Sequence, residues 1–324
     1  MRECMRKLLV FFLSALLLVA CGQRKGSKAD VVAVRSFPRV EVPAMIQDNA
    51  GRQQYVSSHF WDSFLAMDGV SDSLLINGVK KEEVEQNLST YVALMHLLPV
   101  DEAQKHISDF FRKMDETQSR QGKTLLYLQM TELVAKYLYD PNSPYRSEDL
   151  YLPFVEGMVA SGNTQQDKLT AYRFELEKCR INPYGSVAPD FKFKDIKGRT
   201  GSLHGVKGEY TMLFFSNPGC ETCLEIIETI QARPYIGGLI AGGKLAIVNI
   251  YIDYEVDTWK SYAPKYPSDW INAYDFEHRI YDEEIYFVRA IPSLYLLDKD
   301  KRIIFKDVPV ERALAYLEET LKTQ

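Results

Sequence analysis

The clearest chemistry in this sequence belongs to two cysteines three positions apart, Cys220 and Cys223. They follow an aromatic and β-branched stretch, residues 210–215, which predicts a buried strand that Asn217-Pro218-Gly219 ends. Apolar residues at helical spacing after Cys223 place both cysteines on the first turn of a helix. Free backbone N–H groups and the helix dipole stabilise a thiolate there. We therefore expect Cys220, the outer thiol, to attack a disulfide and Cys223 to resolve the mixed disulfide.

The N-terminus has the features of a bacterial export signal. A basic start precedes an apolar run over residues 8–19 that is too short to span a bilayer well. The run ends in Val19-Ala20-Cys21, which resembles a lipobox, so we predict a signal peptide over residues 1–20 and lipid on Cys21. A tether over residues 21–46 follows, and the lipid holds the chain on the membrane, facing the periplasm. An ordinary signal peptide or an uncleaved anchor is the alternative.

The use of cysteine in the rest of the chain bears on the role of the pair. An exported chain meets an oxidising compartment, where a disulfide-stapled scaffold would carry more than one close pair. The pair therefore favours redox chemistry, with a permanent disulfide in a binding domain as the alternative. No metal site is predicted, because zinc would have too few ligands near Cys220 and Cys223. Cys179 lies on an apparent helix and is predicted to be a buried apolar residue.

A second motif, Ile291-Pro292, makes the pattern more specific. With the cysteine pair, and with residues 187–191, 194–199 and 290–298, it resembles the thioredoxin superfamily in its membrane-tethered TlpA/ResA-like branch. This resemblance implies an α/β thioredoxin fold, a mixed central sheet flanked by helices, over residues 184–324. It also implies that Pro292 follows a cis bond and lies against the cysteines, and that Ile291 and Pro292 contact the substrate peptide.

The sequence departs from this family at several positions. Gly219 stands where relatives usually have Trp, and Phe214 where thioredoxin has a buried acid that assists proton transfer from the second cysteine. Ile226 stands where ResA-like proteins often have Glu, so no proton acceptor for Cys223 is identified. Asn217 replaces the Thr or Ser that a peroxiredoxin-type peroxidase requires, so peroxidase activity is not predicted.

Glu221 and Thr222, the residues between the cysteines, are predicted to tune the direction of the reaction. A carboxylate beside Cys220 opposes formation of its thiolate. Strong oxidants owe their strength to a stabilised reduced thiolate, so Glu221 favours a reductant.

Residues 47–183 are predicted to form an all-α domain ahead of the thioredoxin-like one. One of its helices is expected over residues 102–114, with Asp101 as the N-cap. The segments 60–62, 139–144 and 182–185 resemble an uncharacterised helical domain found before thioredoxin-like domains in some bacterial lipoproteins, which implies no activity. The histidines of this part are scattered without the spacing of metal ligands.

Composition limits the classes of partner. The 324 residues are 46% hydrophobic, which suits packed cores, and a net charge of −5 without a basic block excludes nucleic acid as a partner. We expect a membrane-tethered thiol–disulfide oxidoreductase that reduces protein disulfides in the periplasm, receives electrons from a membrane donor, and needs no cofactor beyond the Cys220–Cys223 disulfide. The alternative is a thioredoxin-fold binding or scaffold module whose cysteines are not catalytic.

Overall fold

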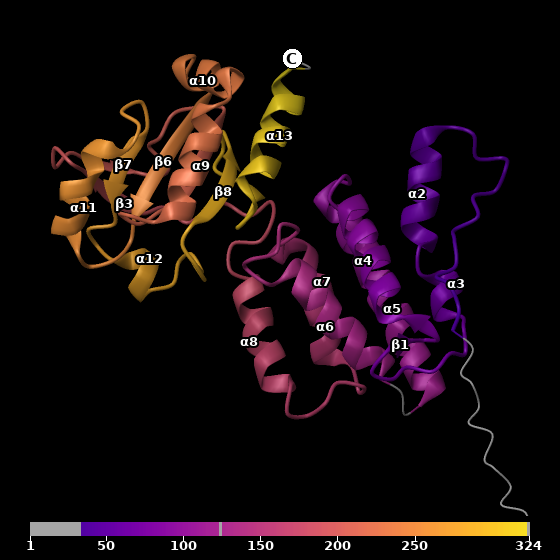
Figure 1. Cartoon of the computed structure of the whole chain (residues 1–324). Coiled ribbons are helices and arrows are strands. Elements are labelled where there is room, and N and C mark those ends of the chain that lie inside the picture. Colours follow the sequence, from indigo (N-terminus) through magenta and orange to yellow (C-terminus); the bar gives the residue numbers. More distant parts are fainter. Residues whose placement is uncertain (1–33, 123–124, 323–324) are drawn as a thin grey trace, which may run out of the picture. The chain divides into compact units, whose positions relative to one another are not determined.

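A computed structural model describes residues 34–122 and 125–322 of the chain (Figure 1). The predicted signal peptide over residues 1–20, the predicted lipidation site Cys21 and the first part of the tether lie outside the described residues. Within the part that is described, no helix has both the length and the apolar character that crossing a membrane requires.

The N-terminal half of the described chain is helical, as predicted. Its helices pack around one hydrophobic core, which collects buried residues from every helix except α2. The elements in chain order are α2 (Asn49–His59), α3 (Asp62–Leu65), β1 (Leu75–Ile76), β2 (Val79–Lys80), α4 (Lys81–Met95), α5 (Val100–Gln121), α6 (Leu126–Leu138), α7 (Glu148–Ala160) and α8 (Leu169–Cys179).

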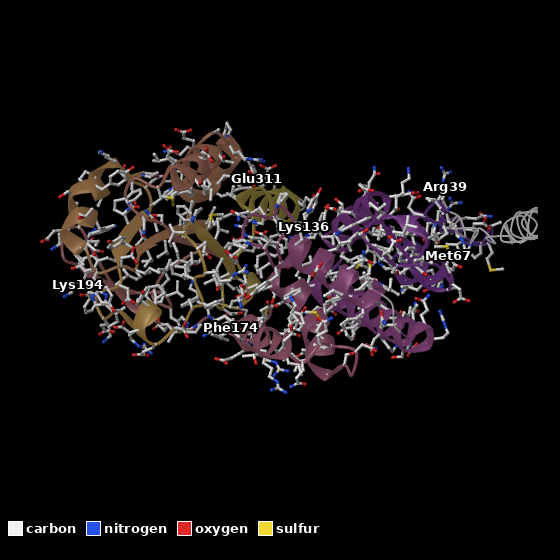
Figure 2. All side chains as sticks on the ribbon, turned by 60° about the horizontal axis from the view of Figure 1, so that its bottom comes forward. Arg39, Met67, Lys136, Phe174, Lys194 and Glu311 are labelled. Carbon is white, nitrogen blue, oxygen red and sulfur yellow. A yellow bond between two sulfur atoms is a disulfide. The ribbon has the colours of Figure 1, made fainter. Side chains whose placement is uncertain are left out.

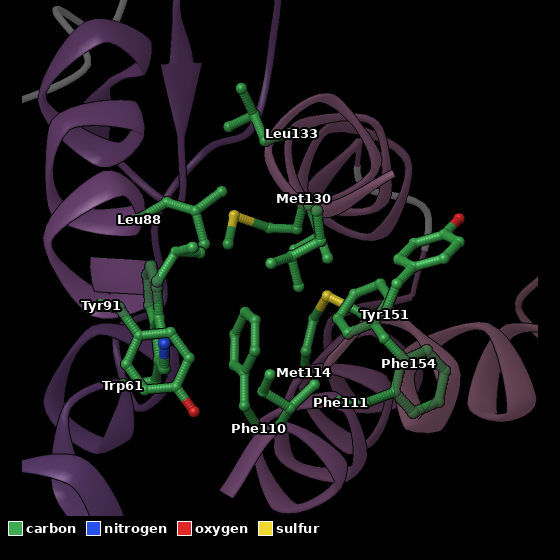
Figure 3. Close-up of a cluster of buried hydrophobic side chains, with 14 of the residues drawn as sticks. Trp61, Leu88, Tyr91, Phe110, Phe111, Met114, Met130, Leu133, Tyr151 and Phe154 are labelled. Carbon is green, nitrogen blue, oxygen red and sulfur yellow. The ribbon is translucent and has the colours of Figure 1, made fainter. Parts of the chain in front are cut away.

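Aromatic rings dominate the centre of this helical core (Figure 3). Trp61 stacks on Phe110 of α5 with ring centroids 4.6 Å apart, and its edge meets Tyr91 of α4 at 5.6 Å. Gly157 of α7 allows the close packing of α7 on α5, because a β-carbon there would lie only 2.3 Å from Phe111. Large rings on two helices and a glycine on the third therefore fix how α4, α5 and α7 meet.

Two local features of the helical half differ from the expectation. Helix α5 begins at Val100 and continues to Gln121, with Pro99 rather than Asp101 at the N-cap. Asp101 instead lies in the first turn, where its negative charge interacts favourably with the helix dipole. The second feature is the β1–β2 hairpin, whose turn residues Asn77 and Gly78 both have positive φ. An Asn-Gly pair between short apolar segments is a hairpin signal that the sequence analysis missed.

The C-terminal half is a seven-stranded mixed sheet with strand order β4-β3-β7-β6-β5-β8-β9. β6 lies at its centre, parallel to both β5 and β7. The elements are β3 (Lys192–Asp195), β4 (Thr200–Ser202), β5 (Tyr210–Phe215), α9 (Glu221–Gln231), α10 (Pro234–Ala241), β6 (Leu245–Tyr251), α11 (Val256–Tyr262), η1 (Ala263–Lys265), β7 (Ile271–Tyr274), α12 (Arg279–Asp282), β8 (Ser293–Asp298), β9 (Ile303–Phe305) and α13 (Val310–Lys322).

Both faces of the sheet are covered, which explains why its central strands are apolar throughout. Met212 and Phe214 of β5 pack into a cluster that includes residues of α9, α10, α11 and α13. Leu213 and Phe215, which alternate with them, pack into a second cluster with residues of α12 and of the segment before β3. The structure therefore has the thioredoxin-like fold that was predicted, with a mixed sheet flanked by helices and a helical region in front of it.

Candidate active site

The two cysteines lie where β5 passes into α9, as the sequence predicts. β5 ends at Phe215, and Gly219 turns the chain with φ +74°, a conformation that favours glycine. Cys220 is then the N-cap of α9, and its sulfur accepts a hydrogen bond from the backbone N–H of Cys223 at 3.1 Å. The two cysteines form a disulfide, with their Cα atoms 5.2 Å apart.

The two sulfurs differ in their surroundings. Cys223 is 1% exposed and belongs to the hydrophobic cluster that also contains Phe214 and Ile227. Cys220 is only partly buried and packs against the edge of that cluster. A disulfide with one accessible sulfur and one buried sulfur presents Cys220 to an incoming thiol or disulfide. After reduction, the same free N–H groups at the start of α9 stabilise a thiolate on Cys220.

The second predicted motif reaches the same turn from β8, the strand next to β5 in the sheet. The bond between Ile291 and Pro292 is cis, as predicted. β8 runs antiparallel to β5 and places Ser293 opposite Phe215, so Pro292 lies beside the residue that follows the end of β5. Ile291 packs against the same cluster as the cysteines. Strand register therefore brings together two segments that are far apart in the sequence.

Glu221 and Thr222, the predicted tuning residues, are both exposed on the first turn of α9. The Glu221 carboxylate is therefore largely screened by water, which weakens its influence on Cys220. Thr222 likewise contributes no buried group beside the disulfide.

Polar side chains that the sequence analysis did not single out surround the turn before the cysteines. Ser216 is 1% exposed and donates a hydrogen bond to Asn249 Oδ1 at 2.5 Å, while the Tyr266 hydroxyl lies 3.4 Å from the same serine oxygen. Asn217 donates from Nδ2 to Asp253 Oδ2 at 2.7 Å. Their positions could have identified two of these residues, because Asn249 lies in the central strand β6 and Asp253 follows its carboxyl end.

Phe214 stands at the position where the sequence comparison led us to look for a buried acid; it is fully buried and its apolar ring supplies no base for Cys223. Tyr251 shares the hydrophobic cluster of Cys223. Burial, followed by the nearby charges of Asp253 and Glu255, raises the pKa of Tyr251 to about 12. The Tyr251 phenol therefore stays protonated at neutral pH and does not accept the thiol proton.

The helical region holds the segment that carries the cis bond. Both regions belong to one compact unit that begins at Val34. Arg289, two residues before Ile291, donates to the backbone carbonyl of Tyr139 at 2.5 Å. Its Nη2 donates to Asp307 Oδ2 at 3.1 Å, and Asp307 Oδ1 accepts from Ser293 at 2.9 Å. These contacts connect the two ends of the Pro292 loop to each other and to the end of α6.

A buried ion pair continues this connection into α7. Glu148 is 1% exposed, and its Oε2 lies 2.5 Å from Nζ of Lys306, which is fully buried. Its Oε1 lies 3.0 Å from Nε of Arg289. The short distances between opposite charges hold this group together. The sequence did not lead us to predict Lys306 and Arg289 as partners of Glu148.

Cys179 is free and fully buried, as predicted. Burial, together with the charge of Glu148, raises the pKa of the Cys179 thiol far above its ordinary value. Among residues 34–122 and 125–322 there is no group of three or more His, Cys, Asp or Glu residues arranged to hold a metal ion.

Residues 20–182 match a family described as a domain of unknown function, DUF5106. Among solved structures the chain is similar to a thioredoxin-like protein from Bacteroides caccae, with 32% identity and a TM-score of 0.73 over 88% of this chain and 99% of that one. This likeness spans the helical region and the sheet region together. No curated protein matches the chain.

Two further solved structures are similar to this chain over less than half of its length. One is the C-terminal domain of an uncharacterized protein from Bacteroides fragilis, with 41% identity and a TM-score of 0.41 over 42% of this chain and 98% of that one. The other is a domain of a possible thiol-disulfide isomerase from Cytophaga hutchinsonii, with 28% identity and a TM-score of 0.35 over 44% of this chain and 97% of that one.

Proposed function

Because this chain belongs to the DUF5106 family and has a thioredoxin-like fold, we propose that it is a thiol–disulfide oxidoreductase whose redox centre is Cys220 and Cys223. One observation carries the proposal. The partly exposed Cys220 caps a helix and is bonded to a buried Cys223, beside the cis bond before Pro292. This arrangement offers one sulfur to a partner and keeps the second within reach of it.

The reaction follows from these positions. In the reduced protein the Cys220 thiolate attacks one sulfur of a substrate disulfide, forming a mixed disulfide and releasing the other substrate sulfur as a thiolate. Cys223 loses its proton and attacks the Cys220 sulfur. The second substrate thiolate leaves, and the Cys220–Cys223 disulfide forms. Two electrons have then passed to the substrate, whose two thiolates take up protons, and a donor dithiol must reduce the protein for the next turnover.

Ile291 and Pro292 are proposed to contact the substrate chain during this exchange. They lie beside the turn that carries Cys220, and the backbone preceding Pro292 is not part of β8. An extended substrate peptide placed there would have its disulfide next to the Cys220 sulfur. Protein disulfides are therefore the proposed substrates.

The test is reduction of a protein disulfide, followed as insulin precipitation in the presence of dithiothreitol. Wild type should accelerate the reaction and Cys220→Ser should not. Cys179→Ala is the matched control, because it removes a thiol remote from the proposed chemistry, and it should retain the activity. Equal rates for wild type and Cys220→Ser would instead support a binding or scaffold module with a non-catalytic disulfide.

The cellular setting is proposed from the N-terminal sequence. Lipid on Cys21 would attach the chain to a membrane facing the periplasm, and a membrane protein there would supply electrons. The test is metabolic labelling with a fatty acid. Label should be present on wild type and absent from Cys21→Ser, which should also leave the membrane fraction. Label retained by Cys21→Ser would contradict the lipoprotein proposal without affecting the redox one.

A further inference from the structure

A cavity of about 1030 Å³ lies at the opposite end of β5 from the cysteines. Its wall includes Tyr210, the first residue of β5, whereas the cysteine turn follows Phe215, the last. A strand of this length spans roughly 20 Å, so the cavity is separate from the redox centre. The loop between α4 and α5, strand β9 and helix α13 form most of the remaining wall. The volume is that of a site for a small organic molecule.

A half-buried guanidinium forms part of the wall. Arg312 of α13 donates from Nη1 to Nδ1 of His96. The other ring nitrogen of His96, Nε2, lies 2.9 Å from the backbone carbonyl of Tyr145 and therefore carries the hydrogen. His96 is thus neutral when it makes both bonds. A neutral imidazole satisfies one donor of Arg312 but does not balance its charge.

Within the described chain, no carboxylate pairs with Arg312. The other partner of its guanidinium is the ring of Phe305, whose centroid is 4.7 Å from the guanidinium carbon. Burial lowers the pKa of Arg312 to about 10, and no acidic group acts against this shift. The other two arginines of the wall differ, because Arg146 lies 3.6 Å from Asp307 and Arg302 is exposed.

Among the described residues, no ion pair joins Arg312 to an acidic residue of the wall. Glu311 and Glu319 are exposed on α13, where Figure 2 labels Glu311. Asp298 accepts hydrogen bonds from the backbone N–H groups of Asp300 and Arg302 in the β8–β9 turn. A half-buried cation without a counter-ion is partly desolvated at a cost in free energy, so an anion that enters the cavity would recover part of that cost.

The rest of the wall suits the body of an organic molecule more than a simple inorganic anion. Tyrosine and phenylalanine rings also line it, from the α6–α7 loop, the segment between α8 and β3, strands β5 and β9, and α13; these residues are Tyr145, Tyr184, Tyr210, Phe305 and Tyr316. We propose that this cavity binds a small organic acid, with the carboxylate on Arg312 and an aromatic or aliphatic body against these rings. The assignment does not depend on the redox chemistry of the cysteines.

The test compares two probes of the same shape by isothermal titration calorimetry on the purified full chain at neutral pH. Phenylbutyrate carries the carboxylate, and phenylbutanol replaces it with a hydroxyl. Wild type should bind phenylbutyrate roughly tenfold or more tightly than phenylbutanol, as a charge-assisted pair gains over a neutral one. Arg312→Gln should lose this preference. Arg302→Gln, which removes an exposed arginine of the same wall, should keep it.

A second measurement separates binding from a structural role. Without any probe, the melting temperature of Arg312→Gln should be equal to or higher than that of wild type, because the substitution removes a half-buried charge that no carboxylate balances. Equal affinity of wild type for the acid and the alcohol, or no binding of the acid at millimolar concentration, would overturn the proposal. So would an equal loss of acid preference in Arg302→Gln and Arg312→Gln, or a lower melting temperature for Arg312→Gln.

Discussion

Replacing Glu148 by Gln should destabilise the protein far more than an ordinary surface change. Lys306 is fully buried, and its other partners are the backbone carbonyls of Lys178, Cys179 and Ile181, between 2.5 and 3.3 Å away. These dipoles solvate the ammonium but carry no opposing net charge. Glu148→Gln therefore leaves a buried cation without its anion.

The expected cost is about 3–5 kcal/mol, the range found when one partner of a buried pair is removed. For a domain with about 5–15 kcal/mol of total stability, this is a large fraction. The pair itself adds little to stability. Burial raises the pKa of Glu148 in spite of the charges of Lys306 and Arg289, so desolvation outweighs the attraction that the carboxylate receives. Glu148 and Lys306 therefore matter to stability mainly because each one neutralises the buried charge of the other.

A double-mutant cycle measures this dependence. Lys306→Met removes the ammonium and keeps an unbranched apolar side chain in its place. The double variant Glu148→Gln/Lys306→Met contains neither charge, and we expect it to be more stable than Glu148→Gln alone. Urea unfolding followed by circular dichroism gives the four free energies of unfolding. The coupling energy should be about 2 kcal/mol or more, within the range of directly contacting residues.

The reasoning fails if the two substitutions are additive within about 0.5 kcal/mol, the value expected of independent sites. It fails equally if Glu148→Gln costs less than about 1 kcal/mol, because a buried Lys306 would then tolerate the loss of its anion. Lys136→Met is the matched control, since Lys136 pairs with Glu85 on the surface and its side chain is 60% exposed. That substitution should change the free energy of unfolding by no more than about 0.5 kcal/mol.

Three further predictions concern single residues. Glu221→Gln should make the Cys220–Cys223 couple more oxidising in a titration against glutathione, by no more than about 30 mV, which corresponds to about one pKa unit; a shift toward more negative potentials would contradict the tuning role. Asp149 is buried, and desolvation raises its pKa to about 6 against the lowering effect of the hydrogen bond from the Tyr184 N–H. Between about pH 4 and pH 6, Asp149 is therefore protonated in the folded chain and ionised in the unfolded chain. The free energy of unfolding falls as pH rises through this window, by about 3 kcal/mol at most. Asp149→Asn should raise the melting temperature at pH 7 and flatten its pH profile below pH 6; a melting temperature below that of wild type at pH 7 would contradict this. Cys179, whose thiol pKa is raised by burial, should escape alkylation by iodoacetamide in the reduced, folded chain while Cys220 is labelled; peptide mapping that finds equal labelling of both would contradict its burial.

The parts of the site that follow from local sequence were predictable. A short apolar strand, a turn with Pro and Gly, and an amphipathic helix place the cysteines at a helix start, and the structure has the strand over residues 210–215 as predicted. The position of Ile291 and Pro292 beside that turn came from resemblance to a family. The local sequence of neither segment predicts the strand register that pairs Ser293 with Phe215.

The polar contacts between the two regions were not predictable, because their partners are distant in sequence. Arg289 contacts the carbonyl of Tyr139 across 150 positions, and Lys306 reaches the carbonyl of Lys178 across 128. Lysine and arginine are mostly exposed residues, so sequence patterns assign them to the surface. The hairpin at Asn77 and Gly78 could have been predicted, because an Asn-Gly pair between short apolar segments is a strong local signal for a hairpin turn.

The contacts of Arg289 have a consequence for how the two regions relate in function. Arg289 and Ser293 bracket the Pro292 loop, and Asp307 accepts hydrogen bonds from both. The remaining partners of Arg289, the Tyr139 carbonyl and Glu148, belong to the helical region. A chain that lacked this region would keep the cysteines and the sheet but would leave Arg289 and Lys306 without their helical partners. The helical region therefore helps to fix the loop proposed to contact substrate, although both cysteines of the proposed redox centre lie in the C-terminal half.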